Sequence, residues 1–437
     1  MSPDTVAPYL VSDARSVSDA WLDRMELVAL TGQSLGPSGD PERTFDVVAV
    51  GKASREMIGA VATICGDRVR RRLVIADGPA HFDEDTVVVG EHPIPGAGSL
   101  LAGRRLLEFL RAPSDADCTL FLISGGASSL CVVTASPLDL EDLGGLWAAA
   151  LTSGIDITTL NRLRAASSAI AGGGVLRDVS TMFSQSLIMV DNVISGAQWV
   201  ASGLTYDYQP NDDEVDELLV AVGLRGTDLG DRIRCAAQNR RQAMSAPTRS
   251  VHENSVVAEP SMMLEQARDE ARRRGYRVVF VGADVRGDVD QVSKDWTEAI
   301  KRELGRGDSF CVIGVGEVTI RVLGSGLGGR CQEFAWAMAG SLASLDRDCV
   351  FLARASDGRD FLVGVGGAWV DNTTRDRAEG MGFSWADVAA DNDSYRPLAA
   401  LDQLVPGGHT GWNLCDLYVA CVASSNVGVS EQERDRL

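Results

Sequence analysis

The sequence predicts an α/β protein of two domains, for three reasons. Short apolar segments typical of buried strands alternate with helical patterns along almost the whole chain. Glycine-rich turns follow several of these segments, as expected where parallel strands lead into helices. The length of 437 residues also exceeds the ~250 to 300 residues at which a single hydrophobic core stops growing. We therefore expect a doubly wound domain over residues 1–245 and a second α/β domain over residues 246–437.

The predicted strands are apolar runs of five to ten residues that end near glycine or an acidic residue. They cover residues 45–51, 71–78, 86–93, 118–126, 186–195, 276–284, 310–318, 350–358 and 368–372. Residues 53–64 have the periodicity of a helix directly after the first strand. The best candidate for a linker spans residues 206–252, where acidic and polar stretches flank a helical pattern, and this segment places the domain boundary near residue 245.

Charge and cysteine content restrict the possible partners. The formal net charge of -20 repels nucleic acid backbones and anionic membranes, so neither is expected as a partner. Nine cysteines without a CxxC pair indicate a reduced protein with neither a disulfide framework nor a cysteine-rich zinc site. No export signal and no apolar stretch of ~18 residues is found. We expect a cytoplasmic monomer or homodimer that binds small molecules.

Lys52 is the first candidate functional residue, because lysine is rare in this chain and occurs only three times. It lies between the apolar run 45–51 and the predicted helix 53–64, in a strand-to-helix turn where a cation can reach an anion held by backbone amides. A lysine whose stem covers the start of the helix is an equally good interpretation from position alone.

Two glycine-rich turns are candidate anion sites. In the first, Ser124, Gly125, Gly126 and Ser128 follow a strand, so backbone amides and hydroxyls can form an anion nest, although a simple tight turn is also possible. The second turn contains a G-x-G-x-x-G match at residues 324–329 and continues into Arg330, which offers a forked cation at the start of a helix. Pairing of this arginine with Glu333 or solvent is the alternative.

Acidic residues recur at the carboxyl ends of predicted strands: Asp191, Glu317, and Asp357 with Asp360. Gathered at one sheet edge, such carboxylates suit Mg²⁺ bound with a nucleotide, whereas each taken singly is more often a turn cap. His92 lies in a loop rich in glycine and proline, where hydrogen bonding within the loop is the simpler interpretation.

Eight segments, taken in order, resemble the glycerate 2-kinase family, whose carboxy-terminal part is called the MOFRL domain. They are VAVGKASREM (48–57), GEHPIPGAGSLLAGRRLLEFL (90–110), LFLISGGASSL (120–130), SGIDITTLNRLR (153–164), VDNVISGAQWVASGLT (190–205), GEVTIRVLGSGLGGRCQE (316–333), SDGRDFLVGVGGAWVD (356–371) and GGHTGWNLCDL (407–417). They cover most of the chain without a large gap and occur in the same order as in the family, and this shared order is the basis of the resemblance.

The resemblance implies a Rossmann-like doubly wound N-terminal domain, a smaller mixed C-terminal domain of the MOFRL type, and an active site in the interdomain cleft. It also implies transfer of the γ-phosphoryl group of ATP, with Mg²⁺, to a hydroxyl of D-glycerate or a related metabolite. The implied catalytic residues are Lys52, Arg330 and Asp191. The residues implied to bind substrate or phosphate are Ser124, Gly125, Gly126, Ser128, His92, Asn161, Arg164, Gly328, Gly329 and Asn413, and those implied to bind metal are Asp191, Glu317 and Asp357.

The chain departs from the family pattern in its cations. Ala165, Ala171 and Gly174 stand where the family has two lysines and an arginine, which predicts weaker binding of polyanions. A bulkier or less anionic metabolite is therefore as plausible a substrate as D-glycerate. Phe361 replaces a family glycine, and Trp412 replaces a threonine. The ring of Trp412 is suited either to stack on a substrate or to fill a core.

Three alternatives to a glycerate kinase stay open. One is a kinase for a bulkier sugar-like or cyclitol-like substrate. In any of the kinase interpretations, Arg162 and Arg164 are candidates to replace the lost positive charge. Another is a binding protein that keeps the site residues without turnover. The third is a nicotinamide-dependent reductase, which only the G-x-G-x-x-G match supports.

Overall fold

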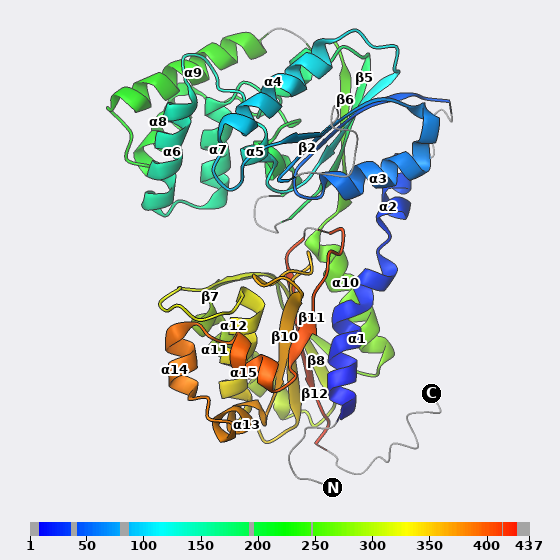
Figure 1. Cartoon of the computed structure of the whole chain (residues 1–437), viewed down its shortest axis with the longest axis vertical. Coiled ribbons are helices and arrows are strands. Elements are labelled where there is room, and N and C mark those ends of the chain that lie inside the picture. Colours follow the sequence, from blue (N-terminus) through cyan, green and yellow to red (C-terminus); the bar gives the residue numbers. More distant parts are fainter. Residues whose placement is uncertain are drawn as a thin grey trace. The chain divides into compact units, whose positions relative to one another are not determined.

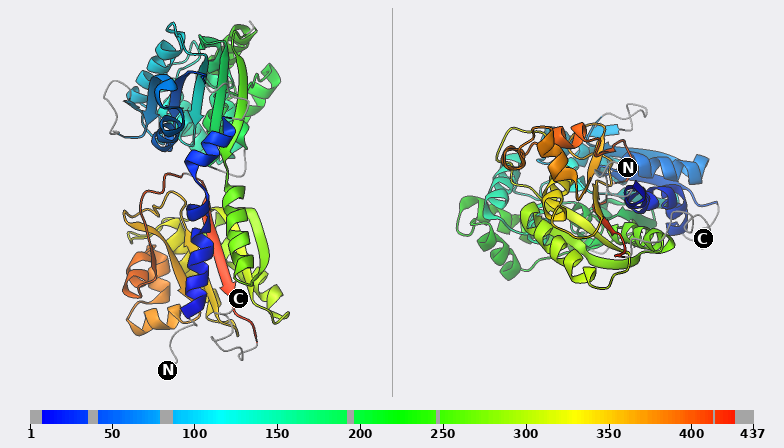
Figure 2. Two further views of the ribbon diagram at one scale, coloured as in Figure 1. Left: turned by 90° about the vertical axis from the view of Figure 1, so that its right-hand side faces the viewer. Right: turned by 90° about the horizontal axis from the view of Figure 1, so that it is seen from below.

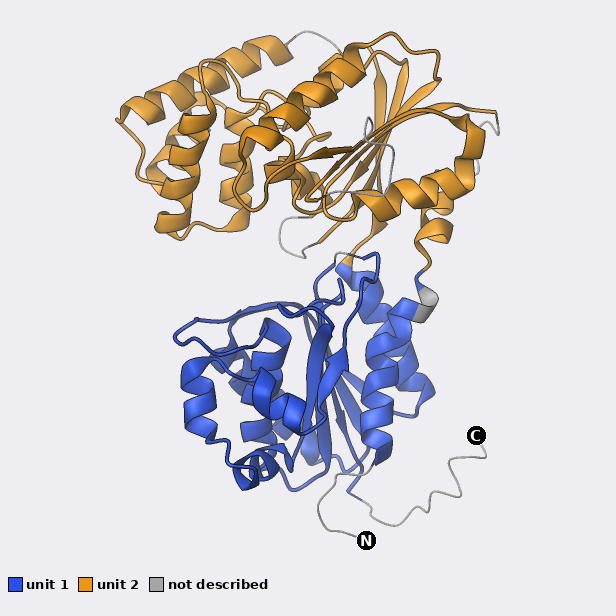
Figure 3. Ribbon diagram, viewed as in Figure 1, with its two compact units in different colours: residues 1–25, 260–437 blue, residues 26–259 orange. Residues whose placement is uncertain are grey.

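The computed structural model describes residues 8–35, 42–78, 87–191, 196–245, 248–412 and 414–425. The chain forms two compact units (Figure 3). Unit 1 comprises residues 1–25 and 260–437, and unit 2 comprises residues 26–259.

Unit 2 is built on a six-stranded sheet in the order β3-β2-β1-β4-β5-β6, and every described strand pair is parallel (Figure 1). This order and direction confirm the doubly wound prediction for the N-terminal part. All residues of the two central strands β1 and β4 are buried, as expected for strands covered on both faces. The strands are β1 Phe45–Val50, β2 Val69–Ala76, β3 Val87–Val89, β4 Cys118–Ile123, β5 Phe183–Met189 and β6 Val251–Ala258.

The helices of unit 2 form a layer on the sheet and a separate helical group. Val48 and Val50 of β1 pack in one cluster with the apolar sides of α4 and α5, whereas α3 contacts β1 and β2. Helices α6 to α9 surround a core of their own (Figure 1). The helices are α2 Leu27–Ser34, α3 Ser54–Cys65, α4 Ala97–Arg111, α5 Ala127–Leu130, α6 Leu140–Ser153, α7 Ile157–Ser167, α8 Asp212–Ala221 and α9 Asp228–Met244, with 3₁₀ turns at Gly66–Arg68, Gly174–Asp178 and Ala197–Ser202.

Unit 1 contains a mixed six-stranded sheet in the order β11-β10-β9-β12-β8-β7. Only β7 and β8 pair in parallel among the described strands of this sheet, and the other neighbours are antiparallel. The largely parallel arrangement indicated by the sequence pattern therefore belongs to unit 2. The strands are β7 Arg277–Asp288, β8 Phe310–Thr319, β9 Cys349–Arg354, β10 Val365–Asp371, β11 Leu404–Pro406 and β12 Asp416–Val422.

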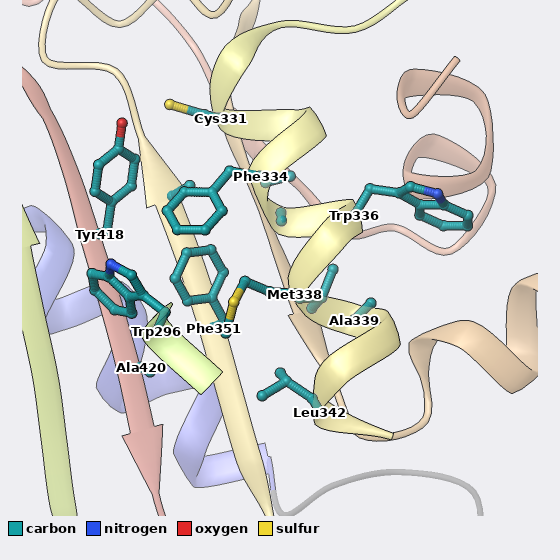
Figure 4. Packing of buried hydrophobic residues seen from close by; sticks show 14 of the residues in the cluster. Trp296, Cys331, Phe334, Trp336, Met338, Ala339, Leu342, Phe351, Tyr418 and Ala420 are labelled. Atoms are coloured by element: carbon teal, nitrogen blue, oxygen red, sulfur yellow. The ribbon is translucent and has the colours of Figure 1, made fainter. Parts of the chain in front are cut away.

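An aromatic cluster holds the helices of unit 1 on this sheet. Trp296 of α11, Phe334 of α12, Phe351 of β9 and Tyr418 of β12 meet edge to face, with ring centroids 4.8 to 6.2 Å apart (Figure 4). The cluster fixes the first turn of α12, which begins at Arg330. The helices are α1 Pro8–Arg24, α10 Pro260–Arg273, α11 Val289–Leu304, α12 Arg330–Leu342, α13 Thr374–Gly380, α14 Trp385–Asp391 and α15 Tyr395–Ala400.

The chain crosses between the units twice, whereas the sequence analysis placed one boundary, at residue 245. Helix α1 belongs to unit 1, where it lies beside α10 and β12 (Figure 2). Its buried residues include Leu10, Val17 and Trp21, and the Trp21 ring meets that of Trp412 at 6.3 Å. The second crossing falls after residue 259 because residues 251–258 form strand β6 of unit 2. Apolar packing of α1 and pairing of β6 are tertiary effects that local patterns do not reveal.

None of the described helices combines the length and the apolar character needed to cross a membrane.

Candidate active site

Lys52 projects from a turn that is fastened to the neighbouring strand end. The Lys52 N–H donates to the Gly125 carbonyl at 2.9 Å, and the Ala53 N–H donates to the Ser124 hydroxyl at 3.0 Å. Gly51 has φ +124°, and a Cβ atom there would lie 2.2 Å from Ser124 Oγ. Glycine is therefore required for this close approach. The Lys52 side chain is exposed, and it makes no ion pair with a described residue.

The turn that follows β4 offers a row of backbone donors. The N–H groups of Gly125, Gly126, Ala127 and Ser128 have no acceptor within the described part of the chain. Consecutive free N–H groups of this kind make a concave anion site. Ser124, which was expected to bind phosphate, is instead fully buried, and its hydroxyl accepts the bond from Ala53. Its place in the structure is that of a residue that positions the Lys52 turn.

Lys52 and His92 both lie over Gly126. A Cβ atom on this glycine would lie 3.2 Å from Lys52 Cγ and 3.3 Å from His92 Cδ2. Partial burial, followed by the positive charges of Lys52 and Arg164, lowers the pKa of His92, while Asp77 opposes this shift. His92 is therefore neutral at pH 7 and acts beside the lysine as a polar group rather than as a cation.

A hydrogen-bonded chain of side chains joins three more of the predicted residues. Ser128 Oγ lies 2.8 Å from Ser202 Oγ, which donates to Asn161 Oδ1 at 3.1 Å. Arg164 Nη1 donates to the same oxygen at 3.4 Å, and its guanidinium lies over the Trp147 ring at 4.5 Å. The sequence analysis missed Ser202, which has φ 54° and is buried. A left-handed backbone at a residue other than glycine is a mark of functional sites, but only coordinates display it.

In unit 1, Arg330 is held by two carboxylates at the start of α12. Its guanidinium lies 3.3 Å from Asp416 and 3.3 Å from Glu317. Burial raises the pKa of Asp416 to about 7, and the charge of Arg330 opposes that shift. Asp416 also accepts a hydrogen bond from the Tyr418 hydroxyl at 3.3 Å. The sequence analysis did not predict Asp416 as a site residue, although an acidic residue inside the apolar run 414–422 indicated a buried carboxylate. The Asp416 charge in turn raises the pKa of Arg330.

The glycine-rich loop before Arg330 is filled by acids and amides of the same unit. The N–H groups of residues 323–327 donate to atoms of Asp391, Asn392 and Asp393. A Cβ on Gly328 would lie 2.4 Å from the Ser394 hydroxyl, and one on Gly329 would lie 2.2 Å from a carboxylate oxygen of Asp360. The glycines thus make room for the chain's own side chains. The N–H groups of Gly328, Gly329 and Arg330, at the start of α12, have no acceptor within the described residues.

The expected metal ligands are divided between the two units, with Asp191 in unit 2 and Glu317 and Asp357 in unit 1. No group of three or more His, Cys, Asp or Glu side chains is placed to hold an ion among the described residues. Asp191 follows β5 in unit 2 and is partly buried, while Glu317 pairs with Arg330 in unit 1. Asp357 is exposed and accepts the Arg359 N–H at 2.8 Å, which is a turn cap. Asn413 lies outside the described residues.

The positions of the lost cations are buried. Ala165, Ala171 and Gly174 are almost inaccessible, and a Cβ at residue 174 would lie 2.1 Å from the Ala169 carbonyl oxygen. The buried guanidinium of Arg240 donates to the carbonyls of residues 171 and 172 at 2.7 and 2.6 Å. An arginine at residue 174 would therefore require the backbone to move.

The other departures have separate explanations. Trp412 packs on Trp21, which supports the core interpretation of this ring. Phe361 has φ 65° and is exposed, which explains a glycine at this position in the family pattern. Of the two candidate replacement cations, Arg162 pairs with Glu214 at 3.3 Å, whereas Arg164 lies at the site.

Together, the doubly wound sheet, the open glycine turn and the cations beside it define a two-unit α/β protein with an anion site at a strand end. Two family models match the chain. The model described as Domain of unknown function (DUF4147) covers residues 13–235, and the model described as MOFRL family covers residues 310–416. The first match spans more than half of the chain, so the chain belongs to that family, and with the MOFRL segment this is the glycerate 2-kinase family that the motifs indicated.

Characterised relatives agree with this assignment. The D-glycerate 2-kinase of Thermotoga maritima is 25% identical and aligns over 86% of this chain and 90% of its own length. The glycerate 2-kinase of Pyrococcus horikoshii is 26% identical, over 95% and 96% of the two chains. A crystal structure of glycerate kinase from Thermotoga maritima superimposes with a TM-score of 0.81 at 22% identity and covers 95% of this chain and 100% of that one. The fold is therefore shared.

Proposed function

We propose that this chain is an ATP-dependent kinase that transfers the γ-phosphoryl group to a hydroxyl of D-glycerate or a related hydroxy acid. The observation that carries the proposal is the open turn of residues 125–128, with four N–H donors and with Lys52 directly beside it. Phosphoryl transfer needs donors that hold anionic oxygens and a cation that neutralises developing charge. The names of the relatives from Thermotoga and Pyrococcus support this reaction class.

The residues of each unit have distinct parts in the proposal. In unit 2, the turn and Lys52 bind anionic oxygens of nucleotide or substrate, and Ser124 holds the turn in place. In unit 1, Arg330 supplies a second cation whose orientation Asp416 and Glu317 fix. No step is assigned to a metal ion.

A nicotinamide-dependent reductase has weaker structural support than the kinase. The G-x-G-x-x-G match was its only motif, and the N–H groups of residues 324–327 in that loop already bind the chain's own oxygens. A pyrophosphate would have to displace them. Calorimetry with ATP against NADH separates the two functions, and we expect ATP to bind and NADH not to bind.

The test of turnover is coupled ADP release with ATP and Mg²⁺ across D-glycerate, related hydroxy acids, polyols and cyclitols. We expect Lys52→Ala and Arg330→Ala each to lower kcat/KM by at least ~100-fold, because each removes a charge that counters the transition state. Lys301→Ala is the matched control, since this lysine is exposed and pairs with Glu298 at 3.5 Å on the outer side of α11.

Three results would contradict parts of the proposal. Unchanged kinetics in both variants would place the site elsewhere. Measurable ATP binding without ADP release on any substrate would favour a binding protein without turnover. Release only with sugars or cyclitols would keep the kinase and replace the hydroxy acid.

We further propose a cytoplasmic monomer or homodimer, since all nine cysteines are free thiols, as is usual in a reducing compartment. Light scattering on the purified chain distinguishes the two oligomeric states.

A further inference from the structure

A small cavity lies in unit 2 behind the open glycine turn. Its volume is about 20 Å³, the space of one water molecule or one methyl group. Apolar side chains make up most of its wall, among them Leu143, Trp147, Ile170 and Ala171, and Arg164 closes one side. The cavity is therefore an apolar space with a single charged group on its border.

The other polar groups on the wall are already bonded. Ser128 and Ser202 bind each other through their hydroxyls, and Ser168 accepts the N–H groups of residues 170 and 171. Arg164 differs. Its Nε is buried without an acceptor among the described residues, and Asn161 accepts a single bond of 3.4 Å from its Nη1. Of the five N–H donors of this guanidinium, the structure bonds one to a side chain.

A buried guanidinium with unpaired N–H donors is suited to bind an anion. Leaving such donors unpaired destabilises the free protein, and a carboxylate satisfies two of them in parallel. Burial lowers the pKa of Arg164 to about 10, so the group remains charged at pH 7. The Trp147 ring holds the guanidinium plane in place. A ligand that fits both the cation and the cavity has a carboxylate and a small alkyl group close together.

We propose that Arg164 binds the carboxylate of the acceptor substrate and that the cavity receives a methyl-sized branch of the same molecule. This inference rests on the proposed kinase function and narrows its acceptor to a hydroxy acid with one more alkyl group than D-glycerate. Ala171 makes the space available, because any larger side chain at this position grows into the cavity. The family resemblance places a lysine at this position, so the cavity accounts for that departure.

The experiment compares D-glycerate with two methylated analogues, 2,3-dihydroxy-2-methylpropanoate and 2,3-dihydroxybutanoate, by ADP release and by calorimetry. We expect kcat/KM for at least one methylated acid to exceed that for D-glycerate by about 10-fold or more, as one methyl group in an apolar pocket typically gives. Ala171→Val fills the space and brings this ratio to about one. Arg164→Gln weakens all three acids together, because it removes the carboxylate contact.

The matched control is Ala169→Val, which adds the same two methyl groups at an exposed position of the same loop and keeps the wild-type ratio. If Ala171→Val does not fold, Val132→Ile closes the cavity from another wall. Turnover of D-glycerate without a preference for methylated acids refutes the cavity role and leaves the kinase intact. A preference that survives both filling variants refutes it as well. If no acid is turned over, the kinase proposal fails, and the calorimetric affinity ratio in wild type and Ala171→Val decides the cavity role by itself.

Discussion

The carboxylate of Asp360 can serve a structural role or bind a ligand, and the free energy of unfolding of its variants distinguishes the two roles. Asp360 is 4% exposed, and its carboxylate oxygens accept the N–H of Cys331 at 3.0 Å, the N–H of Gln332 at 2.8 Å and the Gln332 side-chain amide at 2.9 Å. It therefore caps the helix that begins at Arg330. Asp360→Ala leaves two buried backbone N–H groups without an acceptor and removes one of the two bonds that the Gln332 amide donates to Asp360. Each lost bond costs on the order of 1 to 2 kcal/mol. We expect a loss of about 4 kcal/mol in the free energy of unfolding, and a smaller loss for Asp360→Asn, which keeps one oxygen.

The assay is urea unfolding followed by tryptophan fluorescence, with Asp357→Ala as the matched control. Asp357 is exposed and closes a turn by one bond, so its replacement is expected to cost no more than about 1 kcal/mol. Equal losses in the two alanine variants would refute the capping role. Lost activity with unchanged stability in Asp360→Ala would show that this carboxylate acts on a bound ligand instead.

Two further predictions concern backbone fit and pH. Gly51 has φ +124°, and the Cβ atom added by Gly51→Ala would lie 2.2 Å from an oxygen, so this variant is expected to destabilise unit 2 by about 3 kcal/mol or more. Gly59→Ala, inside α3, meets nothing within 4 Å and is expected to stabilise the protein by up to about 1 kcal/mol. Thermal unfolding of both variants tests this prediction, and equal effects would refute it. The pKa of Asp416 is about 7 in the folded chain, whereas its ordinary value is 3.8. Between pH 3.8 and pH 7, the folded state therefore keeps a proton on this carboxyl that the unfolded state has lost. The free energy of unfolding is therefore expected to fall as pH rises across that range. Urea unfolding at several pH values should show a weaker pH dependence in Asp416→Asn than in the wild type. The same slope in both proteins would refute the raised pKa of Asp416.

The sequence predicted best what lies within one strand, turn and helix. Strands β1 and β4 are continuous apolar runs, and the Lys52 and Gly125 turns follow them directly, so the fold class and the first half of the site were accessible from local patterns. Strand β6 was not predicted, because residues 251–258 include a histidine, a glutamate and an asparagine, and the predicted linker ended inside it at residue 252. Contacts between distant segments were beyond such patterns, which is why Ser202 and Asp416 were missed.

The two glycine-rich turns illustrate why motif spacing alone misjudges anion sites. The loop of residues 324–329 matches a nucleotide-binding pattern, yet the N–H groups of its residues 324–327 are already bonded to Asp391, Asn392 and Asp393. The shorter turn of residues 125–128 matches no phosphate motif, and within the described chain its donors have no acceptor. An external anion gains most where the protein supplies no anion of its own, because there it replaces water at free donors rather than a bonded carboxylate. The acids at the strand ends of unit 1 follow the same logic, since Asp360 satisfies a helix start and Asp416 satisfies Arg330. The open turn beside Lys52 is thus the stronger candidate for the phosphate or carboxylate of a ligand.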